Sequence, residues 1–289
     1  MSVQATDAAQ PYIPGKGASV IARRALFYGL VTIVCLIFFV PFVYTISTSF
    51  KTIPDSVNVT LIPHPWTTAA WHQMWTQYDF KTYFKNSFFL CAVIVACNIF
   101  LAGLGGYAFA RLRFPGRDLL FILVLATIMV PDQLRLIPIY VMLVKWHLVG
   151  NFYGYILINL VTATNLFFMR QYFLTIPKDF EEAAKLDGAG YFKTFWRVML
   201  PLALPAIGAL TILQFQGTWN DFFWPLILLN GSPAHYTVQL GLANLRFTYS
   251  TLWPQIAAGS IIAIVPILVV FLALQRFFVS GAVTAGVKG

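Results

Sequence analysis

Acids and bases gather in one stretch of an otherwise oily chain, between residues 177 and 201. Asp179, Glu181 and Glu182 open the stretch, where carboxylates suit the positive end of a helix dipole. Gly188 follows as a left-handed helix stop. The chemistry available to such a segment is ion pairing with something outside the lipid.

The second half of this stretch predicts another short helix, from about Tyr191 to Leu200, closed by Pro201. Its apolar side is expected to carry Phe192, Phe195, Trp196 and Met199. The whole stretch therefore predicts a helix–turn–helix joined to a membrane segment at each end. Two roles stay open for it: an amphipathic hairpin resting on the membrane surface, or a docking element for a cytoplasmic partner.

The rest of the chain must position this stretch. The chain is 59% hydrophobic and 10% charged, with a mean hydropathy of +0.74. Apolar runs of about 20 residues can cross a membrane, and in lipid their backbone groups must bond internally as helices. The runs lie at residues 26–48, 87–110, 119–144, 152–174, 202–229 and 256–278. They predict an all-α domain of six membrane helices over residues 26–289, preceded by a cytoplasmic tail at residues 1–25.

The third run is the weakest, because its clean apolar part ends at Pro131 and is too short to span. We expect it to continue with a kink through Asp132, Gln133 and Arg135 to Val144. The alternative is an end near Pro131 beside a re-entrant segment. The second run carries small residues four apart, Ala102, Gly106 and Ala110, which is typical of close helix packing in membranes.

Basic residues set the orientation. Most of the 19 Lys and Arg residues fall on one side of the predicted segments, and the positive-inside rule makes that side cytoplasmic. Both termini and the charged stretch are then cytoplasmic. The net charge of +9 is explained by this topology and by anionic lipid. We expect no nucleic-acid partner, since the chain has no basic soluble module.

Glu182-Ala183-Ala184, then Gly188, then Val198-Met199-Leu200-Pro201 resemble the EAA loop of ABC importer permeases. Residues 107–117, 218–226 and 275–289 resemble the sugar-importer branch, the MalG-like permeases. The resemblance implies the six-helix permease fold of a type I importer in a bacterial inner membrane. It also implies that residues 175–201 form a coupling loop seated in a partner ATPase.

Site residues and partners follow from the resemblance. It assigns the coupling role to Glu181, Glu182, Ala183, Ala184, Asp187 and Gly188, with Glu182 as the acid that pairs with the ATPase. It implies two ATPase subunits, which bind ATP and Mg, a second MalF-like permease and an extracytoplasmic solute-binding protein. The sequence itself contains no G-x-x-x-x-G-K-[ST] phosphate loop, so we expect neither a cofactor nor a catalytic or metal site in this chain.

Polar residues inside membrane segments are candidates for the translocation path. They are Gln133, Arg135, Gln214, Trp219, Asn220, Asp221 and Trp224, the tryptophans because aromatic rings stack on sugars. Interfacial anchoring or helix–helix hydrogen bonding is an equal alternative for this set.

The function predicted is a permease subunit of an ATP-driven carbohydrate importer. A permease for glycerol-3-phosphate is an alternative, since the Arg135 guanidinium suits phosphate. A secondary transporter would need inverted repeats and midplane ion ligands. A membrane enzyme would need a polar catalytic cluster.

Overall fold

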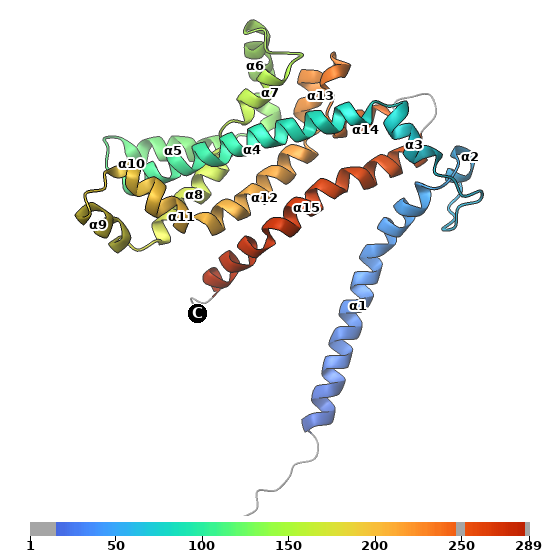
Figure 1. The fold of residues 1–289 in the computed structure, drawn as a ribbon, viewed down its shortest axis with the longest axis horizontal. Helices are drawn as coiled ribbons and strands as arrows, with labels where there is room; N and C mark the ends of the chain where they lie inside the picture. The colour runs from blue at the N-terminus through green and yellow to red at the C-terminus, as the bar shows by residue number, and fades with distance from the viewer. Residues whose placement is uncertain (1–15, 247–251, 287–289) are drawn as a thin grey trace, which may run out of the picture.

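In the computed structural model, the described residues are 16–246 and 252–286, and within these ranges the chain is helical without a β-strand. The helices form an elongated bundle from which one N-terminal helix diverges (Figure 1). Residues 1–15 of the expected tail, the loop segment 247–251 and residues 287–289 lie outside the described part of the chain. The predicted all-α architecture is confirmed.

Within the described residues, four segments are long and apolar enough to cross a membrane, and two sharply bent helix pairs raise the number to six if each pair is one span. Three of the four are the single helices α1 (Lys16–Thr48), α4 (Phe80–Arg111) and α15 (Trp253–Gly286). The fourth is α7 (Phe152–Asn159) followed by α8 (Ala163–Thr175). An upper count of six agrees with the six predicted segments.

The third predicted segment is an elbow. α5 (Arg117–Ile128) and α6 (Asp132–Lys145) meet at 102°. This bend is much sharper than the kink that we expected within one helix over residues 119–144. Pro131 has no amide hydrogen for helical bonding, and its ring disfavours helical geometry at Val130. The helix therefore stops before Pro131, as the second alternative expected, and a new helix begins at Asp132.

Two other predicted segments contain breaks. Residues 160–162 separate α7 from α8, and Thr162 Oγ1 accepts a hydrogen bond of 3.4 Å from the Asn165 amide at the start of α8. The segment predicted over residues 202–229 divides into α12 (Leu204–Asn220) and α13 (Phe223–Leu229). Asp221 Oδ1 accepts a hydrogen bond of 3.4 Å from the Trp224 amide. Side-chain acceptors thus bond amides that helix starts leave without partners.

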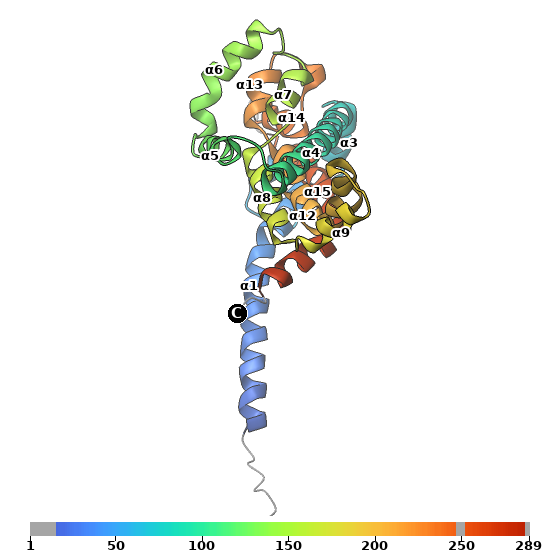
Figure 2. The ribbon, with the colours of Figure 1, turned by 90° about the vertical axis from the view of Figure 1, so that its left-hand side faces the viewer.

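α4 is the central helix of the bundle: it packs along α8 and α12, and α12 packs along α15 (Figure 2). Gly106 allows α4 and α8 to approach closely, because a Cβ on it would lie 2.6 Å from Met169 Cβ and 2.9 Å from the Arg170 nitrogen. Ala102 and Ala110 are buried on the same helix. The small-residue pattern therefore marks a packing face, as its spacing predicted.

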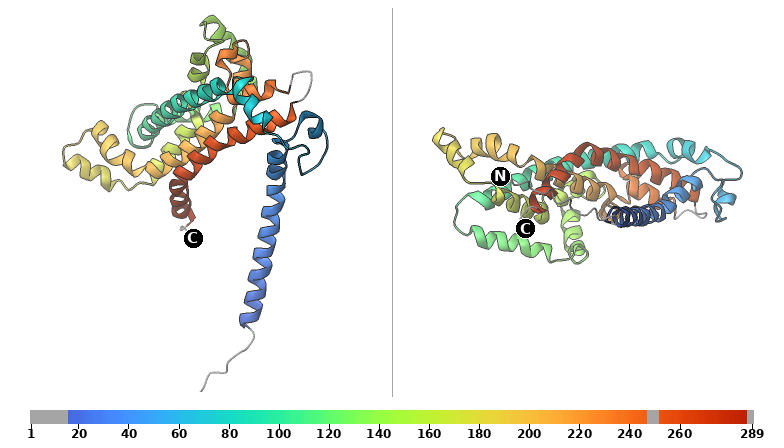
Figure 3. Two further views of the ribbon diagram at one scale, coloured as in Figure 1. Left: turned by 45° about the vertical axis from the view of Figure 1, so that its right-hand side comes forward. Right: turned by 90° about the horizontal axis from the view of Figure 1, so that it is seen from below.

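α1 stands apart from the bundle (Figure 3). The C-terminal end of α1 contacts α15. No residue in the most apolar 18-residue window of α1 is buried. The helix begins at Lys16, so residues 16–25 of the predicted N-terminal tail are part of α1. The apolar surface of α1 is left for lipid or for another chain to cover.

Short helices close one end of the bundle, at the right of Figure 1. They are α2 (Ile53–Ser56), α3 (Ala69–Thr76) and α14 (Val238–Asn244), with a 3-10 turn at Pro233–His235. Lys51 is buried here, and its Nζ donates to the Asn58 and Thr60 carbonyls at 3.1 and 2.6 Å. The loop after α1 is therefore folded around one cation.

Gly106→Ala should destabilise the protein by about 1–3 kcal/mol, because the added methyl group meets backbone and Cβ atoms that cannot rotate away. Gly103→Ala is the matched control, since its Cβ would meet only Phe195 Cζ at 4.0 Å. Thermal unfolding of the purified chain in detergent measures the difference. Equal melting temperatures for the two variants would contradict the close approach of α4 and α8.

Candidate functional site

The charged stretch forms a helical hairpin at the end of the bundle where α4 and α8 both finish (Figures 1 and 2). Its first arm is α9 (Asp179–Leu186). Gly188 makes the turn at φ +74°. The second arm runs through α10 (Tyr191–Thr194), a π-helical turn at Phe195–Met199 and α11 (Leu200–Leu202), then bends by 74° into α12. The predicted helix–turn–helix and its glycine stop are confirmed; the π turn and the sharp bend were not foreseen.

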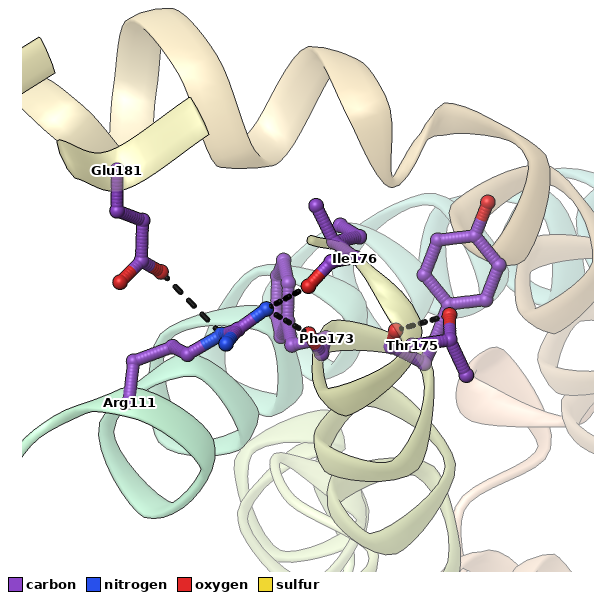
Figure 4. Close-up of polar contacts among 6 residues, drawn as sticks. Arg111, Phe173, Thr175, Ile176 and Glu181 are labelled. Atoms are coloured by element: carbon purple, nitrogen blue, oxygen red, sulfur yellow. Dashed lines mark hydrogen bonds and ion pairs between the residues drawn. The ribbon is translucent and has the colours of Figure 1, made fainter. Parts of the chain in front are cut away.

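Glu181 points inward and pairs with Arg111 at the end of α4 (Figure 4). Arg111 Nε lies 3.2 Å from Glu181 Oε1, and the two side chains are only 5% and 11% exposed. The contact is an ion pair without the alignment of a hydrogen bond. Burial removes water that would otherwise screen the two charges, so each depends on the other.

The same guanidinium binds the end of α8. Arg111 Nη2 donates to the Phe173 carbonyl at 2.6 Å and also to the Ile176 carbonyl (Figure 4). Phe173 lies in the last turn of α8 and Ile176 directly follows the helix, so both carbonyls are at the negative end of its dipole. The Phe173 carbonyl also accepts the Ile176 amide at 3.3 Å, so Arg111 is its second partner. One cation therefore joins α4, α8 and α9.

The remaining coupling candidates divide by the face of α9 on which they lie. Ala184 is buried beside Glu181, at 8% exposure, whereas Glu182, Ala183, Asp187 and Gly188 are exposed. Leu186 was not among the candidates, yet it is 90% exposed. The outward face of α9 thus offers an acid, a small residue and a bare apolar side chain together. A leucine in an amphipathic pattern is ordinarily assigned to the core, which is why the sequence did not single it out.

The second arm is held by aromatic packing. Phe195 is buried, with its ring centroid 5.2 Å from that of Tyr107 and 6.4 Å from that of Phe173. Met199 is buried beside it, but Phe192 and Trp196 are 71% and 40% exposed. Of the predicted apolar side, Phe195 and Met199 are therefore buried, whereas Phe192 and Trp196 remain exposed.

A cavity of about 400 Å³ lies between the α5–α6 elbow, the α7–α8 break and α13. Arg135 lines it and is paired with Asp132. Asn159 and Thr162 line it from the break, and Trp224 lines it from α13. The breaks in the membrane segments therefore bring charged, amide, hydroxyl and indole groups to one space.

The other path candidates do not line this cavity. Gln133 is exposed on α6. Asn220 Oδ1 accepts a 3.2 Å hydrogen bond from Gln239, and Asp221 Oδ2 accepts a 2.9 Å bond from the Tyr155 hydroxyl. Trp219 is 1% exposed, donates to the Ala263 carbonyl at 3.0 Å and stacks on Phe215. Its role in this structure is helix packing.

Gln214 belongs to a buried amide network. Asn165 Nδ2 donates to Asn98 Oδ1 and to Gln214 Oε1, each at 2.7 Å. Asn98 Nδ2 in turn donates to the Asn159 carbonyl at 3.0 Å. The network joins α4, α8 and α12 behind the cavity. Sequence reasoning missed Asn98 and Asn165, although an amide inside an apolar run is a usable signal.

Among the described residues, no group of three His, Cys, Asp or Glu side chains is placed to hold a metal ion. The polar groups of the hairpin and the cavity are arranged for binding, packing and ion pairing.

Comparison with known proteins gives a family and a fold. Residues 99–282 match the model described as "Binding-protein-dependent transport system inner membrane component". The arabinooligosaccharides transport system permease protein AraQ of Bacillus subtilis is 39% identical, over 73% of this chain and 74% of that protein. The sn-glycerol-3-phosphate transport system permease protein UgpE of Yersinia pestis is 35% identical, over 68% of this chain and 71% of that protein.

A crystal structure of a bacterial ABC transporter involved in the import of the acidic polysaccharide alginate contains a chain of the same fold. The TM-score is 0.77 at 24% identity, covering 93% of this chain and 100% of that one. At this identity the likeness shows the fold alone. The type I permease architecture expected from the sequence is therefore confirmed.

Asn165→Leu should lower stability by about 1–2 kcal/mol, since it removes the donor of two interhelical hydrogen bonds, and such bonds contribute about 0.6 and at most about 1.7 kcal/mol each in membrane proteins. Thr175→Ala, on the exposed side of the same helix, is the control. Thermal unfolding in detergent is the measurement. If the Asn165→Leu variant is as stable as the control, the network contributes nothing to helix association.

Proposed function

The chain belongs to the family of binding-protein-dependent transport system inner membrane components, and from this membership we propose that it is the permease subunit of an ATP-driven carbohydrate importer. Members of this family are transport permeases and not enzymes. The observation that carries the proposal is the hairpin, which presents an acidic outer face while its inner face is fixed to α4 and α8.

The outward face of α9 is the proposed docking site for a cytoplasmic ATPase. Glu182 supplies the charge, Ala183 permits close approach and Leu186 supplies apolar area, since each is exposed on that face. Asp187 and Gly188 complete the turn. The chain has no phosphate loop of its own, so two copies of the partner ATPase would bind ATP and Mg.

A second, MalF-like permease is the proposed partner within the membrane. The isolation of α1 from its own bundle supports this, because a helix with no buried residue in its most apolar window has its surface free for another chain or lipid. The cavity beside the elbow is lined by helices of this chain, and a second permease would supply the facing wall. Two permeases would then enclose a common path.

The hairpin end of the bundle is the proposed cytoplasmic side, with both chain termini on that side. Arg111, Arg113 and Arg117 lie near the hairpin, in agreement with the positive-inside rule. The opposite end, with α3 and α14, would face the extracytoplasmic solute-binding protein. The proposed location is a bacterial inner membrane, with lipid around the bundle.

The cavity at the elbow is the proposed part of the translocation path. Carbohydrates present hydroxyl groups and apolar ring faces, and the lining offers amide, hydroxyl and charged groups beside the Trp224 indole. Gln214 supports the cavity through the amide network, and Asp221 precedes α13. Gln133 and Asn220 extend the polar surface outside it, and Trp219 contributes packing.

Glycerol-3-phosphate is the second candidate solute. Arg135 lines the cavity, and a guanidinium suits phosphate. Its charge is already paired with Asp132, so a dianionic solute would have to displace that carboxylate. A neutral sugar could bind both groups as they stand, which favours carbohydrate.

Glu182→Lys should abolish uptake and leave membrane insertion intact, because the reversed charge would repel the basic residue expected on the ATPase. Asp118→Lys is the matched control: it reverses an exposed acid in the first turn of α5, outside the hairpin, and so makes a similar change to a helix dipole. Solute uptake by cells and the amount of protein in the membrane fraction are the two measurements. Wild-type uptake with Glu182→Lys would refute the docking role.

Trp224→Ala should weaken carbohydrate transport by roughly tenfold, which corresponds to about 1.4 kcal/mol of lost contact. Tyr153→Ala removes an exposed aromatic residue of α7 and is the control. Uptake of labelled arabinooligosaccharide and of labelled glycerol-3-phosphate is compared in proteoliposomes that contain the complete complex and its binding protein. Transport of glycerol-3-phosphate without transport of the arabinooligosaccharide would identify glycerol-3-phosphate as the solute.

A further inference from the structure

Arg111 holds both sides of the joint between α8 and the hairpin. Residues 176–178 connect α8 to α9, and this link alone would let α9 pivot. Arg111 binds the Phe173 carbonyl before the joint, the Ile176 carbonyl at its start and the Glu181 carboxylate after it. Because Arg111 is the last residue of α4, the joint is also fixed to the central helix of the bundle.

The guanidinium is suited to this three-way contact. It carries five N–H donors in a rigid plane, and it stays charged when buried. Nη2 donates to the Phe173 and Ile176 carbonyls while Nε faces the carboxylate. A lysine ammonium would preserve the charge but could not reproduce this planar arrangement.

The second arm of the hairpin is fixed to the same two helices. Phe195 contacts Tyr107 of α4 and Phe173 of α8. Tyr107 lies one helical turn before Arg111, and Phe173 is also a carbonyl partner of Arg111. Ion pair and aromatic cluster together leave the hairpin little freedom to move without α4 and α8.

We propose that Arg111 is a positioning residue that makes the coupling hairpin, α4 and α8 move as one unit when the ATPase moves the hairpin. The proposal rests on the proposed function, and it gives the two adjacent acids different duties. Glu182 faces the partner, whereas Glu181 faces Arg111 and transmits the displacement inward.

The test uses Arg111→Lys and Glu181→Gln in the complete complex with its ATPase and binding protein. We expect both variants to copurify with the ATPase and to hydrolyse ATP, because the outward face of α9 is unchanged. Solute transported per ATP should fall by at least about fivefold, the lower end of ordinary coupling between sites. Glu181→Asp keeps the charge and should retain more coupling than Glu181→Gln.

Asp118→Asn is the matched control in the complex, since it neutralises an exposed acid outside the hairpin and should keep the wild-type ratio. Asp179→Asn, on α9 itself, is the control for the measurement on the chain alone. A wild-type ratio in both Arg111→Lys and Glu181→Gln would overturn the proposal. Loss of ATPase binding in Glu181→Gln would overturn it as well, by assigning Glu181 to docking. Failure of Glu181→Gln to insert would do the same, by assigning the pair to folding.

Copurification of the wild-type chain with the ATPase tests the proposed function separately from this inference. Absence of ATPase copurification with the wild-type chain would refute the function itself. The contact of Arg111 with Glu181 is then judged on the chain alone, by backbone hydrogen exchange in α9. Faster exchange in Glu181→Gln than in Asp179→Asn is expected, and equal exchange would show that the contact does not hold the hairpin.

Discussion

A buried guanidinium at the end of α4 needs partners on every side, and the arrangement of the hairpin end follows from that need. An unpaired buried charge would be strongly destabilising. Arg111 is compensated only when the α8 carbonyls and Glu181 come to it together. The end of α8, the direction of α9 and the inward face of the hairpin are therefore linked. The outer face of the hairpin is left exposed because the inner face already makes these contacts, which is why we propose the docking residues there.

A related constraint shapes the membrane part. Backbone groups in a lipid environment must be bonded within the protein, so a helix can break only where side chains or tertiary contacts satisfy its ends. Thr162 bonds an amide at the start of α8, and Asp221 bonds an amide of α13. The Asn159 carbonyl, just before a break, is bonded by Asn98. These polar side chains make the breaks possible, and the breaks open the cavity.

Much of this architecture was readable from the sequence. Runs of about 20 apolar residues are long enough to predict spans, and the acids near Asp179 with Gly188 predicted α9 and its turn. The elbow at Pro131 was only one of two alternatives, because proline marks a break without fixing its angle. The direction of each hairpin side chain could not be predicted, since that depends on Arg111, which lies about 70 residues away in the sequence.

The two adjacent glutamates show why local pattern reaches a limit here. Glu181 and Glu182 are the same residue type, and both lie in the first turn of α9. Successive residues of a helix point about 100° apart, so one can be buried while the other is exposed. Only the neighbour in space decides which, and that neighbour is a cation at the end of another helix. The exposed Glu182 therefore stands on a helix that the buried Glu181 fixes to α4, and on our proposal this contact gives Glu182 a rigid base for docking.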